Sequence, residues 1–172
     1  MLKFIGIIMV LWSCFLFSYM KADAIKRKYE NLKEIKRVLQ ILKNEISFSS
    51  KELLETISEL SQNASGDTAE LLYEIYVKMK NDETQDFGQA WKYAKDKISS
   101  NKIFSDETQK ILDAFCERAG TMSKEIELEN IDKTIKSLES EIENEAENYK
   151  KNRKLIYAFG GFFGIGILIL FI

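Results

Sequence analysis

Both ends of this 172-residue chain are apolar. A cluster of basic residues follows the first apolar run, and another precedes the second, so both clusters lie toward the middle of the chain. The first run extends from Phe4 to Met20 and the second from Leu155 to Ile172. Each is close to the ~20 residues that an α-helix needs to cross the hydrocarbon core of a bilayer. Lysine and arginine beside a membrane span stay on the cytoplasmic side. The sequence therefore predicts two membrane spans that hold one polar domain in the cytoplasm.

The basic residues that set this topology lie next to the two apolar runs, on the side toward the middle of the chain. They are Lys21, Lys26, Arg27, Lys28, Lys33, Lys36 and Arg37 after the first run, and Lys150, Lys151, Arg153 and Lys154 before the second. We expect three parts, which are a transmembrane helix at 1–20, a cytoplasmic helical-bundle domain at 21–154 and a second transmembrane helix at 155–172. The middle part has roughly 130 residues, which is the size of one domain.

Export of the chain is the competing interpretation of its N-terminal run. Ala22, Asp23 and Ala24 have the small-x-small form of a signal peptidase site. Cleavage there would leave a secreted protein with a C-terminal anchor. Lys21 and the basic residues behind it oppose export of that segment. We therefore expect an uncleaved anchor.

The chain contains no proline and only eight glycines, so helix is the main structure open to it. Apolar residues recur at steps of three and four from Ile25 to Ile46, as on one face of a helix. From Leu128 to Ile142 they alternate as in a coiled-coil seam. Neither pattern is broken before the neighbouring apolar run. We expect an all-α fold, an antiparallel bundle of about six helices in which two long stalk helices continue into the membrane helices.

Shorter helices are predicted between the stalks. Four pairs have the spacing of a capping box and mark expected helix starts, namely Ser49 with Glu52, Asp67 with Glu70, Asp86 with Gln89, and Asp106 with Gln109. Gly120 is placed as a glycine that ends a helix. The aromatic residues gathered here predict the compact head of the domain, and they are Phe87, Trp91, Tyr93, Phe104 and Phe115.

The two stalks differ in charge. Residues 21–43 carry eight basic and three acidic residues, whereas glutamates recur at every second position from Glu139 to Glu147. If the stalks pack antiparallel, the basic run lies beside the acidic run, and Lys33, Lys36 and Arg37 are candidate stalk or partner contacts. The alternative is that both runs are solvated faces. Glu45, next to the first apolar seam, is a candidate contact to a partner or the head, or an ordinary exposed charge.

The residues that commonly carry chemistry are scarce. Histidine is absent, so the commonest general base and metal ligand is missing. The chain has no phosphate-binding glycine loop, and Cys116 on an apolar helix is expected to be a small core residue. We expect no catalytic residue, no cofactor, no metal and no small-molecule substrate. The net charge of −2 gives no general attraction to nucleic acid.

Two glycines in the second apolar run are candidate packing residues. Gly160 and Gly164 are four residues apart, the spacing that lets membrane helices approach closely. Such a contact would join the two spans or join copies in a homo-oligomer. Glycines that merely face lipid are the alternative.

The order of these features resembles the stage III sporulation protein AB family of endospore-forming bacteria. The residues that carry the resemblance are the start Met1 to Gly6, the stretch Leu32 to Ile46, the block Phe87, Ala90 and Trp91, the helix end Phe115 to Gly120, and the run Lys151 to Leu155. The chain departs from the family pattern at Ser50 and Lys51, where a Thr-Pro turn is usual. It departs again at Ser123 and Glu127, which stand near positions where Asp and Gln are expected after the helix end. These departures put partner contacts at those positions in doubt.

The resemblance implies a membrane platform in the channel between mother cell and forespore. The helical domain is similar to the cytoplasmic domain of the inner-membrane platform protein of type II secretion and type IV pilus systems. By that similarity it would dock a secretion-type ATPase and other sporulation channel proteins, on the mother-cell side of the outer forespore membrane. A two-span coiled-coil sensor or signalling protein is the alternative, although no output module follows the second apolar run.

Overall fold

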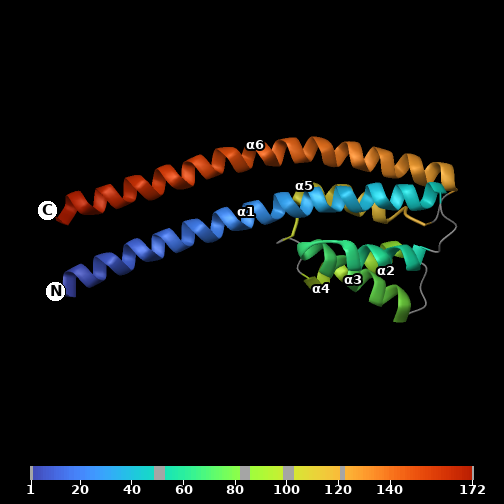
Figure 1. Cartoon of the computed structure of the whole chain (residues 1–172), viewed down its shortest axis with the longest axis horizontal. Helices are drawn as coiled ribbons and strands as arrows, with labels where there is room; N and C mark the ends of the chain where they lie inside the picture. The colour runs from blue at the N-terminus through green and yellow to red at the C-terminus, as the bar shows by residue number, and fades with distance from the viewer. Residues whose placement is uncertain (1, 49–52, 82–85, 99–102, 121–122, 172) are drawn as a thin grey trace. The chain divides into compact units, whose positions relative to one another are not determined.

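A computed structural model describes residues 2–48, 53–81, 86–98, 103–120 and 123–171. Within the helices, the side chains of residues 2–11, 14–15, 17–18 and 152–171 lie outside this description. The helices are α1 (Leu2–Phe48), α2 (Leu53–Asn63), α3 (Gly66–Asn81), α4 (Phe87–Ile98), α5 (Asp106–Cys116) and α6 (Lys124–Phe171) (Figure 1). No strand occurs in the described ranges. The prediction of an all-α fold is confirmed.

The chain divides into two compact units. Unit 1 consists of Met1–Arg27 and Asn144–Ile172, the outer parts of α1 and α6. Unit 2 is Lys28–Glu143 and holds the inner parts of these helices together with α2 to α5. Both long helices run without a break from an apolar end into unit 2, as the uninterrupted sequence patterns predicted.

In the part of the chain that the structure describes, no helix contains a stretch long and apolar enough to cross a membrane. The flanking membrane helices expected at 1–20 and 155–172 are therefore not supported by the described residues. Most side chains of the first segment, and all of the second, lie outside the description.

The hydrophobic core lies in unit 2 and draws on all six helices. Its largest fully buried side chains are Phe104, Leu32, Ile57, Leu71, Ile75, Leu112, Ile131 and Leu138. The apolar steps predicted for α1 and α6 point into this core at Leu32, Ile35, Ile131 and Leu138. Of the five aromatic residues of the expected head, four are buried and Tyr93 is 41% exposed.

Polar contacts fix how the core helices lie relative to one another in unit 2. Lys36 of α1 pairs with Glu139 of α6, and Lys43 with Asp132, so residue numbers rise on one helix as they fall on the other. The two stalk segments are therefore antiparallel (Figure 1). On α3 and α4, Glu74 pairs with Lys97 and the Tyr93 ring lies near Lys78, which makes that pair antiparallel too.

The predicted helix starts have mixed outcomes. Asp86 accepts hydrogen bonds from the backbone and side chain of Gln89, so that start is confirmed. The α5 cap is Ser105 instead of Asp106, because the Ser105 hydroxyl accepts from the Thr108 backbone N–H. α3 begins at Gly66, before Asp67. The pair Ser49 and Glu52 lies outside the described residues.

Two glycines lie where a larger residue would fit poorly. At Gly88 on α4, an added Cβ atom would lie 3.1 Å from the Cys116 carbonyl oxygen, a tight contact with the end of α5. Gly120 has a φ of 79°, a backbone conformation that favours glycine. Its position after α5 agrees with the predicted helix end.

Candidate functional site

Ion pairs join the stalk segments of α1 and α6 in unit 2. The Nζ atom of Lys36 lies 2.8 Å from Oε1 of Glu139, and that of Lys43 lies 2.6 Å from Oδ1 of Asp132. Lys33, also a candidate contact, instead pairs with Glu30 on its own helix at 2.8 Å. This local partner raises the pKa of Lys33. Opposite charges thus meet across the stalk at some of the expected positions and not at others.

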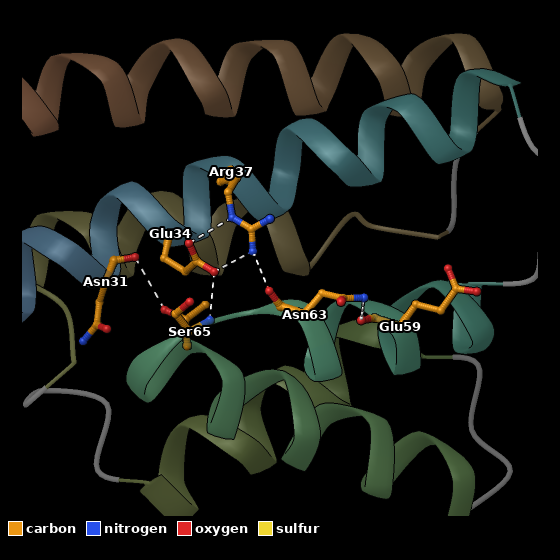
Figure 2. A network of polar contacts seen from close by, with 7 residues as sticks. Asn31, Glu34, Arg37, Glu59, Asn63 and Ser65 are labelled. Atoms are coloured by element: carbon orange, nitrogen blue, oxygen red, sulfur yellow. Dashed lines mark hydrogen bonds and ion pairs between the residues drawn. The ribbon is translucent and has the colours of Figure 1, made fainter.

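Arg37 belongs to a network that ties α1 to the turn between α2 and α3 (Figure 2). Its guanidinium donates to both carboxylate oxygens of Glu34, at 3.0 and 2.7 Å, and to the Asn63 carbonyl oxygen at 2.9 Å. Glu34 Oε1 also accepts from the Ser65 backbone N–H at 2.8 Å. The hydrogen bond from Arg37 lowers the pKa of Glu34, so this carboxylate stays charged. The network holds the α2–α3 turn against the first stalk.

Asn31 forms a second, buried link between α1 and other parts of unit 2. Its Nδ2 atom donates to Asp67 Oδ2 at 2.9 Å and to the Ile103 carbonyl oxygen at 3.4 Å. Its own backbone carbonyl lies 3.5 Å from the Thr68 hydroxyl. One side chain of α1 therefore contacts both the start of α3 and the segment before α5. Buried polar groups with specific partners fix helix register, because each broken bond leaves a costly unpaired group.

Asp113 links α4 to α5. One carboxylate oxygen accepts from the Trp91 indole nitrogen at 2.6 Å, and the other from the Lys95 ammonium at 2.7 Å. Trp91 is buried, so the indole N–H needs a partner inside the protein. These two hydrogen bonds, from Trp91 and from Lys95 to Asp113, fix the orientation of α4 on α5.

At the corner between α5 and α6, Glu127 is a buried acid. Its carboxylate oxygens lie 3.3 and 3.4 Å from the Gly120 backbone nitrogen, which donates to them. Burial raises the pKa of Glu127. One helical turn further, Asn130 has a buried Nδ2 atom without a partner.

The remaining candidate residues are placed as follows. Glu45 lies half-buried near the end of α1. Gly160 and Gly164 lie in α6 within unit 1, in the stretch 152–171 whose side chains are not described. Ser50 lies outside the described residues. Ser123 accepts at its backbone oxygen from the Glu127 N–H, as the residue before a helix does.

The groups of unit 2 offer little for bond-making chemistry. Cys116 is buried, and burial raises its thiol pKa well above the ordinary value, so the nucleophilic thiolate is disfavoured. No group of three or more metal-ligating side chains gathers among the residues that the structure describes. What the polar residues do is hold helices in fixed register.

Sequence reasoning missed Asn31 and Asp113. A signal exists for Asn31, which is a polar residue directly beside the buried seam at Leu32 and Ile35. No comparable signal exists for Asp113, because its two partners lie on another helix.

Comparisons with known proteins give a family and a fold. The family model described as stage III sporulation protein AB matches residues 3–172. A solved structure described as stage III sporulation protein AB (SpoIIIAB) superposes with a TM-score of 0.65 at 14% identity, over 72% of this chain and 97% of that chain. At this identity the likeness concerns the fold. No curated protein matches the chain significantly.

Proposed function

The chain belongs to the stage III sporulation protein AB family, and from this premise we propose that it is a non-enzymatic membrane platform of the channel between mother cell and forespore. The observation that carries the proposal is the family match over residues 3–172, which includes both apolar ends as well as the helical unit. A sporulation role follows from the family. The platform role is the step that experiment has to test.

The helical unit suits a docking role because several independent contacts fix its helices. α1 is tied to α6 through Lys43 and Asp132, to the α2–α3 turn through Arg37, and to the start of α3 through Asn31. A partner that binds one helix therefore meets a surface with little freedom left to lose, which favours binding. Such a unit can hold a secretion-type ATPase and other channel proteins in fixed positions.

Membrane attachment through both ends is part of the proposal. It rests on the two apolar runs and on the basic clusters that border them toward the middle of the chain. Ser65 is an exposed position in unit 2, and its bond to Glu34 uses the backbone N–H, so Ser65→Cys keeps that bond. In a chain with Cys14→Ser, a reagent that cannot cross the membrane should label Leu2→Cys and leave Ser65→Cys unlabelled. Labelling of Ser65→Cys from outside would show that unit 2 lies outside the cell, and this result would contradict the platform role.

The docking role is tested in sporulating cells. A tagged full-length chain should co-purify with a secretion-type ATPase and other channel membrane proteins, whereas an unrelated tagged two-span protein should not. Absence of every channel component from the wild-type sample would contradict the proposal.

Intact mass separates the platform from an exported protein. We expect the membrane-extracted chain to keep its N-terminal run. Loss of a segment ending near Ala24 would favour export instead.

A further inference from the structure

Two short segments, which we call the basic segments, border the apolar ends of α1 and α6. Residues 21–28 and residues 147–154 each carry four basic residues and one acidic residue. The whole chain has a net charge of −2, so the rest of it is acidic overall. On α6 the charge changes sign directly beyond the basic segment, where glutamates recur from Glu139 to Glu147. Positive charge is therefore densest beside the two apolar runs.

Three lysines of the basic segments are exposed cations without an anion. Lys26, Lys150 and Lys151 are exposed, and among the residues that the structure describes none of the three has an ion pair, a hydrogen bond or a ring contact. Arg27 differs from them, because its Nε atom lies 3.3 Å from Oδ2 of Asp23 on the same helix. The charge of these three lysines is thus open to a ligand from outside the chain.

Both apolar runs begin at the same distance along their helices from an ion pair that joins those helices. Met20, the last residue of the first run, precedes Lys36 by 16 residues. Leu155, the first residue of the second run, follows Glu139 by 16 residues, and Lys36 pairs with Glu139. Both helices are continuous over these stretches, so each run begins about 24 Å of helix length from that pair. Two helices that enter one flat membrane surface need this match.

The apolar side chains described next to the first basic segment are exposed as well. Trp12, Leu16 and Tyr19 recur at steps of four and three, as on one face of a helix, and are 67%, 48% and 65% exposed. A ligand at this end of α1 therefore meets apolar and aromatic groups beside cations. An anionic phospholipid matches both, because its acyl chains suit the apolar face and its phosphate suits the lysines. Nucleic acid offers phosphates without acyl chains.

Membrane orientation explains the basic residues only in part. Lysine and arginine anywhere within about 15–20 residues of a span help to keep that side in the cytoplasm. This rule does not require the highest density of charge in the eight residues beside each run. Attraction to anionic headgroups does, because their potential falls off within a Debye length, about 8 Å at physiological salt.

We propose that the basic segments bind the phosphate headgroups of anionic phospholipids in the cytoplasmic leaflet, through Lys26, Lys150 and Lys151. The exposed face of Trp12 and Leu16 contacts the acyl chains of the same lipids. This inference rests on the membrane attachment that is part of the function proposed above. It adds a preference for one class of lipid, which two apolar spans by themselves do not need.

The test uses the full-length chain reconstituted in phosphatidylcholine vesicles. A lipid with brominated acyl chains quenches the fluorescence of a tryptophan that it touches, and Trp12 lies within the first apolar run, whereas Trp91 is buried in unit 2. We expect brominated phosphatidylglycerol to be preferred over brominated phosphatidylcholine by about fivefold or more, the factor expected from one lysine beside an anionic surface. Added salt should weaken the preference. Equal quenching by the two lipids at the same mole fraction would overturn the proposal.

Matched variants locate the preference. The first replaces the three exposed cations, as Lys26→Gln, Lys150→Gln and Lys151→Gln. It should lose most of the preference, although five of the eight basic residues remain to keep the orientation. The control removes the same charge from exposed sites of unit 2, as Lys92→Gln, Lys110→Gln and Lys136→Gln. It should keep the preference, and Lys136 is about 28 Å of helix length from Leu155. Thermal unfolding checks that both variants fold, and equal losses in both would refute the assignment.

Two competing ligands have their own outcomes. An excess of inorganic phosphate at constant ionic strength should leave the lipid preference in place, and its loss would make the basic segments a site for small anions instead. Binding of a labelled deoxythymidine oligonucleotide to the chain in phosphatidylcholine vesicles would assign them to nucleic acid. Either result would replace the phospholipid and contradict the inference.

Extraction separates this inference from the platform function. We expect the chain to stay in the membrane pellet after washing with alkaline carbonate. A chain that stays there but shows no lipid preference would refute the headgroup site and leave the platform standing. A chain that the wash releases does not span the membrane, and the platform would fall together with the lipid preference.

Discussion

The ammonium group of Lys43 on α1 lies 2.6 Å from one carboxylate oxygen of Asp132 on α6 and 2.8 Å from the other. Lys36 and Glu139 form a second pair one heptad away along each helix. The spacing matches that of the buried seam formed by Ile131 and Leu138, so charge and apolar packing select the same antiparallel register.

Reversing one charge of the first pair should destabilise unit 2, and reversing both should restore it. Lys43→Glu is expected to lower the free energy of unfolding by about 0.5–1 kcal/mol, because a half-exposed ion pair contributes little more than this. Lys43→Glu with Asp132→Lys should regain most of the loss in urea unfolding followed by circular dichroism. Lys33→Glu is the control, since its partner lies on its own helix and Asp132→Lys should not rescue it.

Removing the buried amide of Asn31 should have a larger effect than removing an exposed one. Asn31→Ala leaves the Ile103 carbonyl and Asp67 without this donor, which is expected to cost about 1–3 kcal/mol. Asn44→Ala removes the same group from an exposed site on the same helix and should be nearly neutral. The comparison uses urea unfolding of the full-length chain. Similar losses in both variants would show that the Asn31 contacts add nothing.

Glu34 should protect the α2–α3 turn from opening. Glu34→Gln weakens the contacts to Arg37 and Ser65, so amide hydrogen exchange at Ser65 should become faster. Glu30→Gln disturbs another pair of the same spacing on α1 that does not reach the turn, and exchange at Ser65 should stay unchanged.

The pH dependence of this protection has a defined sign. Because Arg37 lowers the pKa of Glu34, the folded state binds this proton less readily than the unfolded chain. The stabilisation by Glu34 is present above its unfolded pKa and is lost as pH falls through its folded pKa. Protection of Ser65 that stays constant through this acidic range would contradict the assignment.

Glu127 should show the opposite pH behaviour. Burial raises its pKa, so the folded state holds the proton more tightly than the unfolded chain, and stability falls as pH rises from the unfolded pKa through the folded one. Glu127→Gln keeps an acceptor for Gly120 without the charge and should raise the unfolding midpoint at neutral pH. The gain should shrink as pH falls below the unfolded pKa. A gain of equal size at every pH would exclude the buried charge as its cause.

Gly164→Leu should weaken association between helices while leaving membrane insertion intact, if the apolar ends span the membrane as proposed. Gly160 and Gly164 share one helix face, and a leucine at 164 prevents close backbone approach. Gly166→Leu points away from that face and serves as the control. Disulfide crosslinking between neighbouring spans should fall for the first variant only, and equal crosslinking in both would show that the glycine face is idle.

How much of the fold the sequence predicted depends on the kind of interaction. Leu32, Ile35, Ile131 and Leu138 were placed in the core from spacing alone, because apolar burial has no direction and needs only the right face. The α5 cap was missed by one residue, because Ser105 and Asp106 are both good caps and backbone geometry selects between them.

Three candidate contacts in one short stretch of α1 show that the sequence does not predict which partner a charged residue finds. Lys33, Lys36 and Arg37 carry the same charge on neighbouring turns, yet their partners lie on the same helix, on α6, and on the same helix plus the α2–α3 turn, respectively. Each choice depends on which carboxylate or carbonyl comes within about 3 Å. Residue type does not encode that distance.

By itself, the sequence determined that this protein is helical and which helix faces are buried, because a chain without proline and with apolar residues at helical spacing has no other way to bury them. The tertiary structure alone decided which polar groups of different helices meet. Hydrogen bonds and ion pairs are short and directional, so pairs such as Trp91 and Asp113 exist only once helices distant in sequence have packed in one register.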